Sequence, residues 1–563
     1  MSLRRSARRR LLAAAAVLAL AASFAWRSGD ARAAPVLSAY PAGLLGNENT
    51  VVALAPSEAY RASYVPGSDV LELPDGRWRY VPAAATAPVT VPAGDRDARA
   101  SVHETRSWLA EGRVPGSTAR ERHMAARALL DMRLLTRPNG AVAAAWHGAW
   151  KYSWPRDASF VAAAFAVTGH ADEAYEILTY NAKTQRGDGT WEARTLLDGS
   201  GPPDDRHWQL DANGWVPWAV WEWFQAAPGK HRHARARVLY PMVRKAADYA
   251  AGSLDARGLP PAGPDYWEIA TDAPNIGTAA PLLSGLRASA DLARRLGHPG
   301  DARRWLDAAR RLADGIKRTF GRNGYQRTVE DGSGSDSAVT FMAPPFNPAD
   351  ALRWADIGHT FSVLRRRNGG VVPGESWSGD TTWTPETMFF ALAGSGTGHG
   401  ALARELVHWL SDHRTSLGAL PEQIDQAGDP YSVAPLAWTD ALLLMTLTQL
   451  DGNTVPVPPA PCDRFGGRVL ILDEPTSALG VKQAGVVLKH IAKARDQGIA
   501  VILITHNPAH AHLVADRFVL LNKGRCVARY RRDEVSRNEV IQTMAGGAEL
   551  DELAHELKSA SAE

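Results

Sequence analysis

Cysteine is nearly absent from this chain. Among 563 residues only Cys462 and Cys526 are cysteines, and both lie in the last fifth of the sequence. No disulfide framework can therefore hold the body of the protein together. The chain must bury an extensive apolar core instead, and its length permits one.

A strong charge of either sign is also missing. The 63 lysines and arginines balance 60 acidic residues, which leaves a formal charge of +3. Such a balance creates no field that attracts nucleic acid, so we expect no nucleic-acid partner. The sequence has no dense run of metal ligands, and we expect neither a metal nor another cofactor.

Long hydrophobic runs are scarce, and the run Leu11–Trp26 is too short for a stable membrane span. Arginines at positions 4, 5, 8, 9 and 10 precede it, and the small residues of Ala31-Arg-Ala-Ala-Pro35 follow it. This order is typical of an export signal. We therefore predict a signal peptide over residues 1–34 and a secreted or extracytoplasmic protein. A general signal and a twin-arginine signal both stay open.

Tryptophan is absent from the end of the chain. All 19 tryptophans lie between Trp26 and Trp438, and the proline-rich stretch Thr454–Pro461 follows. A change of composition at an extended, proline-rich segment is typical of a domain boundary. We predict a linker over 454–464 that separates a domain at 101–453 from a second domain at 465–563.

The part before the linker has a helical pattern. Apolar residues recur at three- and four-residue spacing, as in Leu283, Leu286, Ala290 and Ala293, and Gly, Pro or Asn interrupts the pattern. With aromatic and acidic residues in the connections, this pattern predicts an all-α toroid. The expected helices cover about 117–135, 157–169, 171–185, 214–227, 233–254, 277–296, 299–321, 385–395, 398–413 and 437–450.

Residues 35–100 differ from the helical part. Val51–Leu54 and Arg77–Val81 are short strand-like runs between prolines. An extended lead segment and a small β appendage both fit this pattern, and both stay open.

The stretch Trp150-Lys-Tyr-Ser-Trp-Pro-Arg-Asp157 combines three aromatic rings with an Arg-Asp pair. A sugar ring has apolar faces and a hydroxyl rim, so its pocket needs aromatic rings to stack on and charged groups at the edge. The alternative is a Trp-rich core turn in which Asp157 caps the next helix.

Two glutamates fit the chemistry of glycoside cleavage, which needs one carboxylic acid to protonate the leaving oxygen and a second carboxylate on the other face. Glu268 follows Trp267, which can stack on sugar and also desolvate the acid, and desolvation raises a carboxyl pKa. Glu422 lies in Leu420-Pro-Glu-Gln-Ile-Asp425, before the last expected helix. The alternatives are a solvated helix-edge glutamate and a charge at a helix N-terminus.

In this order and spacing, Trp-Pro-Arg-Asp, Trp-Glu and Pro-Glu-Gln resemble glycoside hydrolase family 15, the glucoamylases and their relatives, over about residues 100–452. The resemblance implies an (α/α)6 barrel that acts by inversion at the non-reducing ends of α-glucans. Relatives with this pattern include trehalases and dextran-acting enzymes, so the α-glucan or α-glucoside substrate stays open.

The resemblance also implies roles for individual residues. Glu268 matches the general acid of the family and Glu422 its general base. The expected substrate-binding residues are Trp150, Trp154, Arg156, Asp157, Gln209, Asp211 and Trp267. Among them, Arg156 and Asp157 match the pair that holds the terminal glucose, whereas Gln209 and Asp211 belong to a connection that lines the subsite past the cleavage point.

After the linker, an apolar strand runs into Asp473 and Glu474, a second strand ends at His506, and Phe518–Val527 has the pattern of a hairpin. In phosphate chemistry one such acid positions Mg²⁺ and the next polarises the attacking water. This part resembles the C-terminal half of an ATP-binding cassette ATPase of the sugar-importer type. The resemblance makes Asp473 the Walker B aspartate, Glu474 the catalytic glutamate and His506 the switch histidine, within a partial α/β fold.

The elements that bind ATP are missing from the sequence. It contains no Gly-x-x-x-x-Gly-Lys-Ser/Thr loop and no Leu-Ser-Gly-Gly-Gln-type signature, since Gly466 and Gly467 directly precede the strand. We therefore expect no ATP binding, and an acidic tail without chemistry from Glu549 onward. Three hypotheses follow: a secreted exo-glycosidase with an inert ATPase fragment, an ATP-driven sugar-import component fused to a sugar-binding helical domain, and a non-catalytic carbohydrate-binding toroid.

Overall fold

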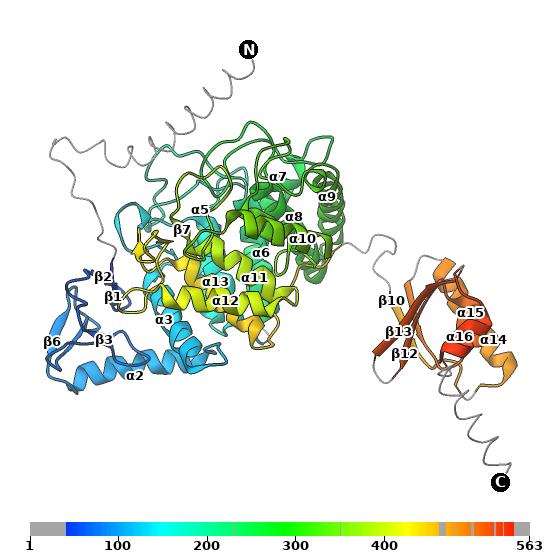
Figure 1. Ribbon diagram of the computed structural model, residues 1–563, viewed down its shortest axis with the longest axis horizontal. Helices are drawn as coiled ribbons and strands as arrows, with labels where there is room; N and C mark the ends of the chain where they lie inside the picture. Colours follow the sequence, from blue (N-terminus) through cyan, green and yellow to red (C-terminus); the bar gives the residue numbers. More distant parts are fainter. Residues whose placement is uncertain are drawn as a thin grey trace, which may run out of the picture. The chain divides into compact units, whose positions relative to one another are not determined.

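The computed structural model describes residues 41–229, 231–349, 351–460, 469–477, 479–496, 500–522, 525–532 and 534–544. The chain divides into unit 1, Met1–Ala460, and unit 2, Pro461–Glu563 (Figure 1). The predicted signal peptide, the Gly466-Gly467 pair and the acidic tail lie outside the described residues.

A small β appendage begins the described part of unit 1. Strands β1 and β2 form an antiparallel pair, and β3, β4, β5 and β6 form a four-stranded antiparallel sheet in chain order. Of the two possibilities for residues 35–100, the structure thus shows the appendage (Figure 1). The strands are β1 (Gly43–Gly46), β2 (Val51–Leu54), β3 (Ser63–Tyr64), β4 (Leu71–Glu72), β5 (Trp78–Tyr80) and β6 (Val89–Val91).

Six inner elements form a closed ring, in which each packs against the next and the last packs against the first. They are α4 (Pro155–Val167), α6 (Ala212–Ala226), α8 (Ile276–Leu296), the 3-10 helix η3 (Ser337–Met342), α11 (Thr384–Gly396) and α13 (Ala437–Leu450). Six outer helices cover them: α3 (Ala119–Leu135), α5 (Ala171–Thr184), α7 (Arg232–Gly252), α9 (Pro299–Arg318), α10 (Ala351–Leu364) and α12 (Gly400–Asp412). The predicted (α/α)6 barrel is confirmed.

The inner and outer helices differ in how much of their surface is buried, because inner helices are covered on all sides and outer helices face solvent on one side. In the inner helix α4 every residue of 155–166 is buried, whereas the outer helix α9 buries one stripe that includes Trp305, Ala309 and Leu312. In the barrel region the sequence did not predict α2 (Arg96–Glu111), α10 or η3. Short connections complete the unit, namely η1 (Gly148–Trp150), η2 (Phe320–Arg322) and a sheet of β7 (Thr382–Trp383), β8 (Gln423–Ile424) and β9 (Pro430–Tyr431).

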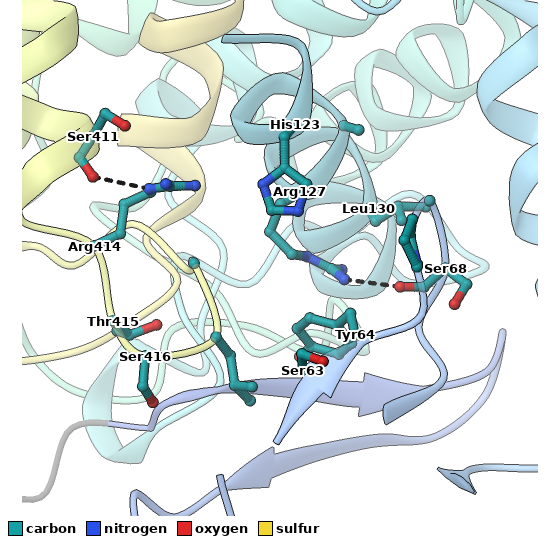
Figure 2. Close-up of a pocket in the computed structure, with 15 residues that line it drawn as sticks. Ser63, Tyr64, Ser68, His123, Arg127, Leu130, Ser411, Arg414, Thr415 and Ser416 are labelled. Carbon is teal, nitrogen blue, oxygen red and sulfur yellow. Dashed lines mark hydrogen bonds between the residues drawn. The ribbon is translucent and has the colours of Figure 1, made fainter. Parts of the chain in front are cut away.

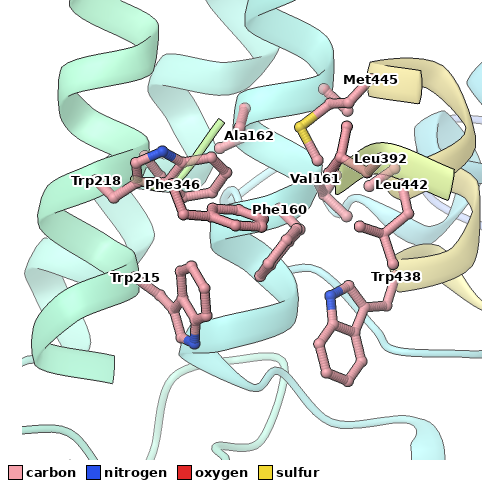
Figure 3. Close-up of a cluster of buried hydrophobic side chains, with 14 of the residues drawn as sticks. Phe160, Val161, Ala162, Trp215, Trp218, Phe346, Leu392, Trp438, Leu442 and Met445 are labelled. Carbon is pink, nitrogen blue, oxygen red and sulfur yellow. The ribbon is translucent and has the colours of Figure 1, made fainter. Parts of the chain in front are cut away.

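An aromatic cluster fills the axis of the barrel (Figure 3). The ring of Phe160, on α4, lies 5.0–5.8 Å between centroids from five other aromatic rings. These are Trp215, Trp218, Phe346, Phe389 and Trp438. Because they come from several inner elements, the cluster holds the ring together and closes its centre.

The inner helices α6 and α8 approach each other at the backbone. A Cβ atom on Gly214 would lie 2.2 Å from the carbonyl of Pro281, and one on Gly285 would lie 2.5 Å from the carbonyl oxygen of Gly214. Only glycine permits this contact, so both positions are fixed by packing.

Unit 2 has a partial α/β fold, as predicted. Strand β10 (Val469–Asp473) pairs in parallel with β11 (Ala500–Ile504), and β12 (Arg517–Asn522) forms an antiparallel hairpin with β13 (Arg525–Arg531). The helices are α14 (Val481–Asp496), α15 (Pro508–Val514) and α16 (Arg537–Met544). Apolar side chains of the β10–β11 pair are left exposed. Ile471 is 63% exposed and Ile502 is 51% exposed, because within the described residues this sheet has two strands.

Two further findings bear on the predicted organisation. The side chain of Val455, in the predicted linker, is buried in the barrel core, so barrel packing continues past residue 453. Among the helices of the described residues, none combines the length and the hydropathy that a bilayer span needs.

Candidate active site

A cavity of about 200 Å³ lies where the N-terminal ends of inner helices meet the loops beside them. Both proposed catalytic glutamates, Glu268 and Glu422, line it. The aromatic residues of its wall are Trp150, Trp154, Tyr266, Trp267, Trp377, Trp383 and Trp438. An enclosure of this kind offers flat apolar faces and carboxylates together, as a sugar site requires.

Glu268 lies in the loop before α8 and has a left-handed backbone conformation, with φ of +58°. Its N–H donates to the Asp265 carbonyl at 2.8 Å, while the Asp265 carboxylate accepts from the Trp267 N–H at 3.0 Å. Arg327 forms an ion pair with Asp265 at 3.0 Å. A non-glycine residue held in this region by its surroundings is a feature of functional sites.

Two donors hold the Glu268 carboxylate. The Trp154 indole N–H donates to Oε1 at 2.6 Å, and the Arg206 guanidinium forms an ion pair with Oε2. The sequence drew attention to the neighbouring Trp267, whereas these two polar partners of Glu268 come from elsewhere in the chain. Trp267 lines the cavity, but the Arg327 guanidinium covers one face of its ring, 3.5 Å from the centroid.

Glu422 lies beside β8 and is buried. Burial raises its pKa, and the negative charge of Glu268 acts in the same direction. Hydrogen bonds oppose this rise in pKa: the Ser432 hydroxyl donates to Oε2, and the Trp150 indole donates to Oε1 at 3.0 Å. Ser432 also has a positive φ, at +70°. Left-handed backbone therefore helps to position both carboxylates, at Glu268 itself and at Ser432, the hydrogen-bond donor to Glu422.

Arg156 and Asp157 lie in the first turn of α4 and line the cavity. The alternative that Asp157 caps this helix is wrong, because Trp154 occupies the N-cap position. Burial raises the pKa of Asp157 to about 7, with Arg156 opposing the rise.

Gln209 and Asp211 do not line the cavity, although the sequence suggested that they would. They are buried behind Arg156, whose guanidinium Nη1 donates to Gln209 at 2.7 Å and to Asp211 at 2.9 Å. Their contact with the site is through Arg156, whose guanidinium they fix in place.

Sequence reasoning missed Glu386, a buried carboxyl that lines the cavity from the first turn of α11. Burial raises its pKa to about 8, and the charges of Glu422 and Asp336 contribute. A sequence pattern could have identified Glu386. It lies three residues after Trp383, the N-cap residue of α11, just as Asp157 lies three residues after Trp154, the N-cap residue of α4. Arg206 was also missed, because its partner Glu268 is 62 residues away in sequence.

In unit 2 the structure brings Glu474 and His506 together. The imidazole Nδ1 lies 2.7 Å from the Glu474 carboxylate, which also accepts the backbone N–H of His506 at 2.6 Å. Asp473 ends β10 opposite Ile504, and its side chain is exposed. No cluster of three or more potential metal ligands occurs in the described parts of the chain.

Solved structures with the same fold include a wild-type glycosidase, with a TM-score of 0.51 and 19% identity over 60% of this chain and 98% of that one. A bacterial glucoamylase complexed with acarbose has a TM-score of 0.51 and 17% identity over 66% of this chain and 64% of that one. Unit 1 therefore has the fold of the glucoamylases.

The curated relatives of this chain are sugar-import ATP-binding proteins, in line with the resemblance of its C-terminal part. The fructose import ATP-binding protein FrcA of Rhizobium meliloti is 38% identical over 85 residues, which are 15% of this chain and 33% of that protein. The ribose import ATP-binding protein RbsA of Shigella dysenteriae serotype 1 is 29% identical over 147 residues, 26% of this chain and 28% of that protein. The chain thus spans about a third or less of these relatives. No family model matches it.

Proposed function

We propose that unit 1 is an inverting exo-acting glycosidase that releases glucose from the non-reducing ends of α-glucans or α-glucosides. The observation that carries this proposal is the presence of Glu268 and Glu422 on one aromatic-lined cavity. The bacterial glucoamylase with the same fold supports the substrate class. A non-catalytic sugar-binding barrel would have no need of two carboxylates in this arrangement.

In the proposed reaction, Glu268 gives a proton to the glycosidic oxygen as the bond to the anomeric carbon breaks. Glu422 takes a proton from a water that attacks the same carbon from the other face. This geometry needs the two carboxyls about 6.5–9.5 Å apart. Arg156 and Asp157 hold the hydroxyls of the terminal sugar. Because the Arg206 guanidinium is paired with Glu268, substrate binding must release that pair before the acid can act.

The stereochemistry of the product tests the mechanism. Inversion of an α-glucoside yields β-glucose first, which NMR of the fresh product detects before mutarotation. If α-glucose appears first, the assignment of roles is refuted. Glu268→Gln removes the transferable proton, so kcat should fall about 10²- to 10⁴-fold while substrate binding is largely kept. Comparing maltose, isomaltose and trehalose as substrates distinguishes the starch, dextran and trehalose types.

A second candidate function is an ATP-driven sugar-import component, and the similarity to import ATP-binding proteins favours it. We propose instead that unit 2 has no ATPase activity, because no phosphate-binding loop occurs in the sequence. A chain that ends at Ala460 should then retain glycoside turnover, and the intact protein should bind no ATP at micromolar concentration. ATP binding in this range, or loss of turnover on truncation, would favour the second candidate. The proposed secretion is tested by following the protein in the culture medium.

A further inference from the structure

A second cavity, here called the appendage cavity, lies between the β appendage and the barrel (Figure 2). Its volume is about 260 Å³. Three segments line it: β3 with the turn after it, one face of α3, and the end of α12 with the loop after it. The residues that carry its charge are His123 and Arg127 on α3 and Arg414 in the loop. None of the proposed catalytic residues belongs to this cavity.

The charge of Arg127 is already balanced. Its guanidinium lies 2.6 Å from the Asp69 carboxylate and 3.1 Å from that of Asp131, and all three side chains are buried. It also donates to the Ser68 carbonyl at 3.2 Å. Arg127 therefore forms part of the wall and is not itself available to a ligand.

Arg414 is different. Its Nε donates to the Ser411 carbonyl at 3.0 Å, but its Nη1 is buried and makes no hydrogen bond in the described structure. In the described residues no ion pair includes Arg414, and Asp412, whose charge acts on the Arg414 guanidinium, is itself paired with Arg120. Leaving a buried, charged donor without an acceptor costs free energy, so the site favours a negatively charged acceptor.

His123 supports the same conclusion. Both residues line the cavity, and the Arg414 guanidinium extends from its loop toward the helix that carries His123 (Figure 2). Burial lowers the pKa of His123, and the positive charges of Arg414 and Arg127 lower it further. Because Asp69 and Asp131 balance Arg127, and Asp412 is paired with Arg120, Arg414 supplies the positive charge of this wall. Ser63 and Ser416 add exposed hydroxyls to the wall, and the structure gives neither a hydrogen-bond partner in the described residues.

We propose that the appendage cavity binds a phosphate-type oxyanion through Arg414 and His123. The guanidinium fork matches the oxygens of phosphate. The volume exceeds what a free oxyanion needs, so the phosphate group is either free or carried on a small polar molecule such as a monosaccharide, whose hydroxyls Ser63 and Ser416 can meet. This site is separate from the proposed hydrolytic pocket and does not depend on the function proposed for it.

Isothermal titration calorimetry of the full chain in phosphate-free buffer tests the proposal, with inorganic phosphate and glucose 6-phosphate as separate probes. We expect saturable binding of at least one probe, weakened about tenfold or more by Arg414→Gln because a charge-assisted hydrogen bond is lost. Equal affinity for both probes means that the phosphate group alone accounts for binding. A higher affinity for glucose 6-phosphate means that the ligand of the cavity is a sugar phosphate. Arg404→Gln, an exposed arginine on α12, serves as the matched control and should bind as the unmodified protein does.

The proposal is overturned if neither probe binds, or if binding survives Arg414→Gln, since the ligand then lies elsewhere, including in the hydrolytic pocket. Far-UV circular dichroism shows whether Arg414→Gln folds. If it does not, His123→Gln replaces it, because His123 lies at the exposed mouth of the cavity on α3. That variant should also weaken binding of the probe several-fold, and unchanged affinity would equally refute the proposal.

Discussion

The buried carboxyl of Glu386 makes the stability of the barrel depend on pH in a way that one substitution can isolate. Burial raises its pKa to about 8 from an ordinary value of 4.5, so the folded protein keeps Glu386 protonated where the unfolded chain ionises it. The sign follows from linkage. The contribution of Glu386 to the free energy of unfolding is fully present below the pKa of the unfolded chain. It is lost as the pH rises toward 8, the pKa in the folded protein.

The magnitude follows from the size of the pKa shift. One pKa unit corresponds to about 1.4 kcal/mol, so between pH 4.5 and 8 the Glu386 carboxyl should lower the free energy of unfolding by about 5 kcal/mol at most. Glu386→Gln has nearly the same shape and does not titrate. The variant should therefore become more stable than the unmodified protein by roughly 1.4 kcal/mol for each pH unit in this range.

Guanidinium chloride unfolding at several pH values, followed by tryptophan fluorescence, measures this difference. Because every tryptophan precedes residue 439, the signal reports unit 1 alone. Glu176→Gln, an exposed glutamate on α5, is the control and should show a difference that does not change with pH. If the difference between Glu386→Gln and the unmodified protein also stays constant from pH 5 to 8, Glu386 is ionised in the folded state and the reasoning is refuted.

Two further predictions concern the groups that position the proposed catalytic residues. A Cβ on Gly374 would lie 2.4 Å from Trp267 Cζ2, so Gly374→Ala should displace the ring next to Glu268 and lower kcat/KM about 10- to 100-fold. Initial rates on maltose measure this loss, with Gly358→Ala, at an open position on α10, as the control. Removing the Ser432 hydroxyl takes away a hydrogen bond that lowers the pKa of Glu422. Since the proposed base acts when ionised, Ser432→Ala should move the acid limb of the kcat/KM profile to higher pH, and an unchanged or lower limb would contradict the role of Ser432.

The regular helices of the barrel could be predicted because each must bury one stripe or all of its surface. The expected range 437–450 matches α13, and 277–296 differs from α8 by one residue. The misses have local causes. The element η3 has six residues, too few for a periodic pattern, and α10 contains Gly358, which weakens the helical signal.

The site residues that lie in a recognisable local motif could be predicted from the sequence. The contacts between residues far apart in the sequence could not. Glu268 and Glu422 stood out beside Trp and Pro, and the fold brings both to one cavity. The positions of Gln209 and Asp211 behind Arg156 depend on hydrogen bonds that span 53 and 55 residues. A local pattern shows that such residues belong near a site but does not show whether they face the ligand.

The aromatic cluster around Phe160 has a consequence for how a long polymer would be handled. Because aromatic rings from the inner elements fill the barrel axis, a polymer held in the proposed hydrolytic pocket cannot thread through the ring. Under the proposed exo-acting function, a released monosaccharide would leave on the side of the ring where the shortened polymer is still bound. After each cleavage the polymer would then have to dissociate from the pocket, so that the monosaccharide can leave before the next cleavage. Product analysis early in digestion should accordingly find many chains trimmed by a few units, and no small population degraded completely.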